Sequence, residues 1–128
     1  ELALLLHGAR NPATADYLER TADDVLAPLT GDTLRSGRRV PPALVGAELE
    51  GEGLTPTAVK ESEDGTRLVL RCVNVTDDVV RGRWRVGRLI EEARLARLDE
   101  TPLDTLSARG DTVEFEAPAH GVVTILLR

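Results

Sequence analysis

The stretch TAVKESEDGTRLVLRCVNVT, residues 57–76, decides the fold because it contains two apolar-rich runs on either side of a charged turn. Its Asp64-Gly65 pair supplies the positive φ angles that a tight two-residue turn needs. We therefore predict that residues 57–62 and 67–75 pair as antiparallel strands. In the second strand apolar side chains occur on both faces, which is typical of a central strand that is covered on both sides.

The sequence beyond this hairpin keeps the two-residue period of strands. The clearest alternation is VVRGRWRV, residues 79–86, where apolar residues and a glycine alternate with arginines. TVEFEA, residues 112–117, alternates in the same way, and GVVTILLR, residues 121–128, closes the domain after the turn PAHG. With earlier strands at 43–49 and 54–62, about eight short, regularly spaced strands predict a mainly β fold, an antiparallel β-sandwich.

The stretch RLIEEARLARLDE, residues 88–100, is ambiguous. A helix would fit the spacing of Leu89, Ile90, Ala93, Ala96 and Arg97, whereas a bent strand would fit Ala93, Leu95 and Leu98. We favour a strand because the elements on both sides are strands.

Residues 1–42 form a lead-in of a different kind, and residues 43–128 carry the sandwich strands. The apolar run at 2–6 ends at His7 and predicts a short buried strand. A helix should follow, with Asn11 and Pro12 as cap and first-turn residues and Pro28 ending it. Its apolar positions are Ala15, Leu18, Ala22, Val25 and Leu26. Residues 30–42, rich in Gly, Ser, Arg and Pro, predict a solvated connection, with a mobile loop at RSGRR, residues 35–39.

Length, net charge, apolar runs and cysteine content limit the classes of function that the chain could have. A chain of 128 residues suits a single domain. A net charge of −6 argues against nucleic acid as a partner, and the apolar runs are far below the ~20 residues that span a bilayer. Cys72 is the only cysteine, which fits a reducing cytoplasm. Because the chain opens on an apolar run without methionine, we expect a fragment of a longer protein.

The sequence shows no assembled set of catalytic or metal-binding residues. His7 and His120 each lie in a turn context without a nucleophile signature beside them, so we interpret both as half-exposed turn residues. Neither H-x-x-x-H nor C-x-x-C occurs. Adjacent acidic pairs could supply the two carboxyl groups of a glycosidase, yet 22 acidic residues in 128 make such pairs expected on a solvated surface. We predict no catalytic, cofactor-binding or metal-binding residue.

Arg81, Arg83 and Arg85 form the one notable local charge feature, which we call the arginine stripe. The stripe could contact an anionic ligand or a partner domain. It could instead form a cross-strand ladder in which each exposed pair adds only ~0.2–1 kcal/mol. The candidate ladder partners are Glu114 with Glu116, or Glu61 with Glu63.

The three aromatic residues argue against a free-standing sugar-binding module. Such modules stack sugar rings on exposed aromatic side chains. Trp84 lies opposite in parity to the arginine stripe, and Tyr17 and Phe115 also lie on predicted apolar faces. We therefore expect all three in the interior.

Three pieces of the sequence resemble the C-terminal β domain of glycoside hydrolase family 38 α-mannosidases. Residues 57–76 are similar to that family's strand, Glu-Asp-Gly turn, Leu-Val-Leu-Arg strand and Asn-x-Thr turn. The matching positions are Ala58, Lys60, Glu63, Asp64, Gly65, Leu68, Val69, Leu70, Arg71, Asn74 and Thr76. Residues 2–29 resemble the family's strand, His-Gly turn, helix and Ala-Pro-Leu exit, and residues 118–128 its closing strand. The family usually has proline where Leu6 stands and often an aromatic near Val73, and nothing matches residues 30–42.

The resemblance implies a parent enzyme that removes α-linked mannose with retention. It implies an aspartate nucleophile, an acid/base carboxylate and a zinc ion, all in an N-terminal α/β catalytic domain. This segment would be a non-catalytic partner of that domain and help to shape the cleft. The candidate interdomain contacts are Arg81, Arg83, Arg85 and Arg71, with the two-sided strand at 68–75. Rival functions are a stand-alone carbohydrate-binding module and an adhesion or assembly domain; clustered His and Asp upstream of Glu1 would favour the enzyme.

Overall fold

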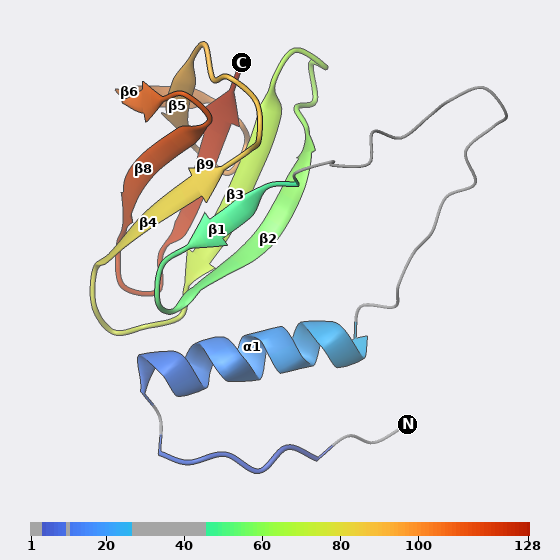
Figure 1. Cartoon of the computed structure of the whole chain (residues 1–128), viewed down its shortest axis with the longest axis vertical. Helices are drawn as coiled ribbons and strands as arrows, with labels where there is room; N and C mark the ends of the chain where they lie inside the picture. Colours follow the sequence, from blue (N-terminus) through green and yellow to red (C-terminus); the bar gives the residue numbers. More distant parts are fainter. Residues whose placement is uncertain (1–3, 10, 27–45) are drawn as a thin grey trace, which may run out of the picture.

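The computed structural model describes residues 4–9, 11–26 and 46–128 of the chain. In that part of the chain one helix precedes nine strands that form two antiparallel sheets, which Figure 1 shows packed face to face. The elements are α1 (Pro12–Leu26), β1 (Glu48–Glu50), β2 (Leu54–Glu61), β3 (Leu68–Asn74), β4 (Val80–Arg85), β5 (Ala93–Ala96), β6 (Pro102–Leu106), β7 (Ala108–Arg109), β8 (Thr112–Ala117) and β9 (Val122–Leu127). The predicted β-sandwich with one short helix is confirmed.

In the hairpin of residues 57–76, β2 pairs with β3 antiparallel, as predicted. The expected two-residue turn is wrong. The loop is closed by the amide of Ser62, which donates to the carbonyl of Arg67 at 2.8 Å, so four residues lie between the two strands' closing pair. Gly65 has a φ of 70°. The Asp64 carboxylate accepts from the Ser62 hydroxyl at 2.6 Å and from the amide and hydroxyl of Thr66 at 3.0 and 2.8 Å. These bonds, that of Ser62 foremost, lower the pKa of Asp64 to about 2 and favour the longer loop.

The two sheets have the strand orders β1-β4-β8-β7 and β2-β3-β9-β5-β6. We call them sheet A and sheet B. Strand β3 lies between β2 and β9, so its predicted central position is confirmed. Leu70 and Cys72 on its inner face are fully buried in the core between the sheets, and Val69 on its outer face is fully buried in a second, smaller cluster. The core therefore depends on the strand that the opening stretch encodes.

The inner face of β4 contains a glycine because the side chains of Leu54 and Phe115 fill the space above it. A Cβ atom on Gly82 would lie 2.4 Å from Leu54 Cδ1 and 2.5 Å from Phe115 Cζ. Trp84, two residues along the same face, is 1% exposed. The predicted inward positions of Trp84 and Phe115 are confirmed.

The sequence patterns did not predict strands β6 and β7. The side chains of β6 are exposed along nearly its whole length, so no apolar alternation marks it. The chain then passes Ser107 and enters β7, which belongs to the other sheet. The favoured strand within residues 88–100 is confirmed as β5, which pairs with β6 and β9.

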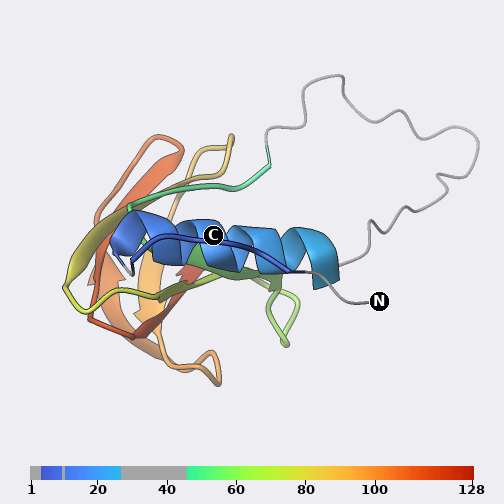
Figure 2. The ribbon, with the colours of Figure 1, turned by 90° about the horizontal axis from the view of Figure 1, so that it is seen from below.

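Helix α1 begins as predicted. The amide of Thr14 donates to Asn11 Oδ1 at 2.8 Å, which is an N-cap bond. The helix lies across the end of the sandwich where β3 ends and β9 begins, as Figures 1 and 2 show from two sides. No helix in the described part of the chain is long and apolar enough to cross a membrane. The predictions for Pro28, for the loop at 30–42 and for the start of the strand at 43–45 fall outside the described residues.

The predicted buried strand at 2–6 is wrong for the residues that can be seen. Residues 4–8 form no strand, and the side chains of Leu4 and Leu6 are 86% and 87% exposed. An apolar run becomes a buried strand only where a neighbouring strand supplies hydrogen bonds and cover. Figure 1 shows that α1 lies between this run and the two sheets in the described structure.

Candidate functional site

The arginine stripe lies on the outer, solvent-facing side of sheet A. Strand β4 runs between β1 and β8, so glutamates flank the arginines on both sides. Arg81 pairs with Glu116 at 3.2 Å, Arg83 with Glu50 and Arg85 with Glu48. The ladder prediction was right for Glu116, whereas the glutamates of the three-residue strand β1 were missed. Glu61 belongs to sheet B, so it cannot join this ladder.

A shallow hollow of about 600 Å³ lies over this ladder. Its charged lining is Glu50, Arg81, Arg83, Glu114 and Glu116. Charges of both signs alternate across the strands, and Arg83 has its pKa raised, first by its hydrogen bond to Glu50. Each arginine is already neutralised by a carboxylate of the same sheet, so the hollow has the properties of a polar contact surface rather than those of a reaction centre.

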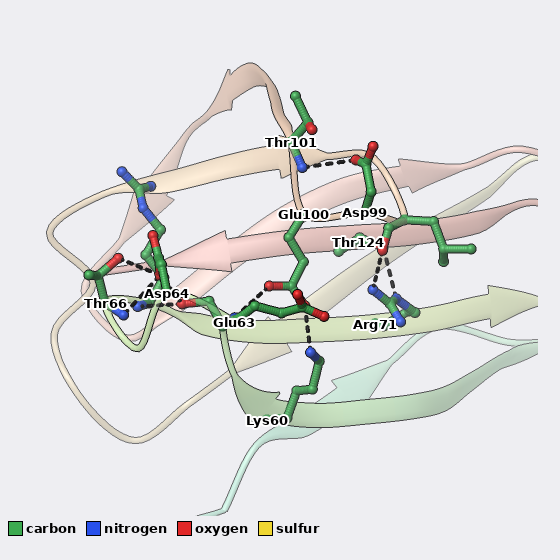
Figure 3. Close-up of polar contacts among 12 residues, drawn as sticks. Lys60, Glu63, Asp64, Thr66, Arg71, Asp99, Glu100, Thr101 and Thr124 are labelled. Carbon is green, nitrogen blue, oxygen red and sulfur yellow. Dashed lines mark hydrogen bonds and ion pairs between the residues drawn. The ribbon is translucent and has the colours of Figure 1, made fainter.

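Arg71 does not lie near the stripe. It projects from the outer face of sheet B, where its Nε donates to Thr124 Oγ1 at 3.0 Å and its Nη2 to the carbonyl of Leu98 at 2.9 Å (Figure 3). The structure therefore divides the four candidate contact residues between two opposite faces. Arg71 links β3 and β9 to the turn between β5 and β6.

Glu100 fixes the same turn from its other side. Its carboxylate pairs with Lys60 and accepts from the amide of Glu63 at 2.9 Å, although these residues are far apart in sequence (Figure 3). Glu100 has a positive φ of 66°, a strained conformation for a residue with a side chain. Its side chain is only 11% exposed, and Lys60 foremost lowers its pKa. The small cluster on this face of sheet B is Val69, Ala96 and Leu126. Sequence reasoning gave no signal for this contact.

The two histidines lie closer together than the sequence suggested. His7 and His120 both line a hollow of about 460 Å³ between α1 and the end of the sandwich. The ring of His120 lies 2.8 Å from Asp77 Oδ1, and both side chains are mostly exposed. Among the described residues, no Ser, Thr or Cys that could serve as a nucleophile lines this hollow. Within residues 4–9, 11–26 and 46–128 no group of three or more His, Cys, Asp or Glu is placed to hold a metal ion.

Asn74 organises the end of the sandwich from inside. Its Nδ2 donates to the carbonyls of Asp78, Ala117 and Pro118 at 2.7, 3.1 and 3.0 Å. Its Oδ1 accepts from the amide and hydroxyl of Thr76 at 2.9 and 2.8 Å. Asn-Val-Thr also fits the pattern of an N-glycosylation acceptor. Because Asn74 is fully buried and its amide group is bonded, the folded chain cannot be modified there.

The remaining side chains of functional interest are Cys72 and the aromatic residues. Cys72 is buried, and burial raises its pKa to about 12, so the thiol is inert in the folded chain. The prediction for Tyr17 was wrong, because its side chain is 53% exposed. Helix α1 reaches the sandwich with another face, so the apolar pattern around Tyr17 did not bury it.

Comparison with known families gives one match. The family described as glycosyl hydrolases family 38 C-terminal beta sandwich domain matches residues 53–125, more than half of the chain. The match covers β2 to most of β9 and thus nearly all of both sheets. No curated protein and no solved structure matches the chain.

Proposed function

Because the chain belongs to the family of glycosyl hydrolase family 38 C-terminal beta sandwich domains, we propose that it is the non-catalytic sandwich of a retaining α-mannosidase. It packs on the catalytic domain of the same polypeptide and helps to shape the cleft that receives the α-linked mannose. The family match over residues 53–125 is the observation that carries this proposal. We place the enzyme in the cytoplasm, in keeping with the single, buried Cys72.

In this proposal the reacting groups lie outside the sandwich. The aspartate nucleophile, the acid/base carboxylate and the zinc ion that the family resemblance implies lie in the catalytic domain. No side chain of this chain takes part in a chemical step. Several carboxylates of the described residues are in keeping with this division, since Glu48, Glu50 and Glu116 form ion pairs with arginines and Asp64 accepts hydrogen bonds within its turn.

A hydrolysis assay tests the assignment. The complete polypeptide that carries this sandwich should hydrolyse p-nitrophenyl α-mannoside, and residues 1–128 alone should not. The matching β-mannoside and α-glucoside serve as controls for substrate class. A complete polypeptide that leaves the α-mannoside intact would show that the proposed substrate is wrong.

The arginine stripe stays our candidate for the interdomain contact on sheet A, and Arg71 is a separate candidate on sheet B. In the complete enzyme, reversing the stripe with Arg81→Glu, Arg83→Glu and Arg85→Glu should lower stability or activity. Each reversal also breaks an exposed ion pair within the sheet, worth ~0.2–1 kcal/mol, so this variant needs a matched control.

The control exchanges the partners of one pair. Glu48→Arg with Arg85→Glu keeps the ion pair within sheet A but inverts its charges toward any partner, and residue 85 lies opposite Thr112 of β8 rather than a glutamate. If the stripe contacts the catalytic domain, this exchange should leave the sandwich as stable as before and still lower the thermal inactivation temperature of the complete enzyme. An unchanged inactivation temperature for both the reversal and the exchange would remove the stripe from the contact.

A further inference from the structure

Several segments that carry exposed large apolar residues lie at one end of the molecule. Figure 1 shows the run at residues 4–9, α1, the connection between β3 and β4 and the start of β9 at this end. Six of the exposed large apolar residues in the described structure belong to these segments: Leu4, Leu6, Tyr17, Val25, Val79 and Val122. We call this set the apolar end. Val79 lies in the connection between β3 and β4, and Val122 begins β9, so the set combines the lead-in with the sandwich. A gathering of this kind on a soluble domain is typical of a contact surface.

The apolar face of α1 continues past the sandwich. Leu18 and Val25 are seven residues apart and thus lie on the same face of the helix. Leu18 is half-buried beside Val73 and Val75. Val25 is 57% exposed, and in Figures 1 and 2 the last turns of α1 extend beyond the sheets. Since a helix of 15 residues is marginal in water by itself, this uncovered half calls for a second partner.

The outer face of sheet A contrasts with the apolar end. Its arginines and glutamates pair with one another, and none of the exposed large apolar residues of the described chain lies on it. An interface with an apolar centre forms more readily where water is expelled from Leu, Val and Tyr side chains than where paired charges must be desolvated.

The order of domains along the polypeptide indicates what covers the apolar end. The family to which the chain belongs is named as the C-terminal sandwich of glycosyl hydrolases, so in such an enzyme the remaining polypeptide precedes the sandwich. The lead-in that joins the two carries Leu4, Leu6, Tyr17 and Val25. We propose that the apolar end docks on the polypeptide that precedes the sandwich in the family 38 enzyme. This inference rests on the proposed function.

Thiol labelling of the complete polypeptide tests the proposal. Tyr17→Cys reports on the apolar end, and Leu103→Cys on β6 is its matched control, because the two native side chains are 53% and 50% exposed. Cys72 gives little background, since it is buried. Labelling by a maleimide, followed by peptide mapping, should be at least about tenfold slower at position 17 than at position 103, because a covered thiol reacts only when the interface opens. Equal rates would overturn the proposal.

A photo-crosslinking amino acid introduced in place of Tyr17 during synthesis identifies the occupant. We expect crosslinks to residues upstream of Glu1. Crosslinks confined to residues 1–128, or formed to a second copy, would also overturn the proposal. These outcomes do not depend on hydrolysis: a polypeptide that protects position 17 but leaves α-mannosides intact keeps the docking surface and loses the proposed substrate.

Discussion

Replacing Asn74 with alanine is expected to lower the free energy of unfolding of the sandwich by about 3–5 kcal/mol. The reason is the loss of five hydrogen bonds from one fully buried side chain. Three carbonyl oxygens and both the amide and the hydroxyl of Thr76 lose a partner where water does not reach easily. Since small domains are stable by only about 5–15 kcal/mol, this loss removes much of the total.

Urea unfolding of the 128-residue chain, followed by the fluorescence of Trp84, measures this effect. Asp77→Asn is the matched control, because Asp77 lies in the connection that directly follows Asn74 and its side chain is 78% exposed. Its change should stay within about 1 kcal/mol. An Asn74→Ala variant as stable as Asp77→Asn would mean that the network around Asn74 contributes little.

Replacing Trp84 with alanine is expected to cost about 3–5 kcal/mol through the cavity that it leaves. Trp84 is 1% exposed and lies between Leu49 of β1 and Val113 of β8 on the inner face of sheet A. It belongs to the same core cluster as Leu70 of sheet B. Closing the cavity would require the two sheets to move together, so we expect only partial relaxation.

Because Trp84 is the only tryptophan, unfolding of this variant is followed by far-UV circular dichroism. Leu89→Ala is the control, since Leu89 is 72% exposed and should change stability by no more than about 0.5 kcal/mol. Equal urea midpoints for the two variants would contradict the position of Trp84 in the core.

Strands with one wet face could be predicted from the sequence. Strands β4 and β8 alternate Arg or Glu with apolar residues, and the pattern identified both the strands and their inward side chains. Strand β6 could not be found in this way, because its side chains are exposed on both faces. Its place follows from backbone pairing with β5, which leaves no periodic signal.

Contacts between residues far apart in the sequence could not be predicted either. The stripe and its exposed orientation followed from parity, but Glu48 and Glu50 became its partners only through the strand order β1-β4-β8. The ion pair of Lys60 with Glu100 likewise joins two hairpins. Burial of Leu4 and Leu6 was predicted from their apolar character alone, which cannot say whether a neighbouring surface is present.

Thermal inactivation of the complete enzyme is the most direct test of the claim that this sandwich supports a catalytic domain. Asn74→Ala changes no group that could reach a substrate. If the catalytic domain depends on the sandwich, this variant should lose α-mannoside hydrolysis at a temperature lower by about 5 °C or more than the parent enzyme and the Asp77→Asn control. If Asn74→Ala destabilises the sandwich but all three proteins inactivate at the same temperature, the catalytic domain does not rely on the sandwich and the account is contradicted.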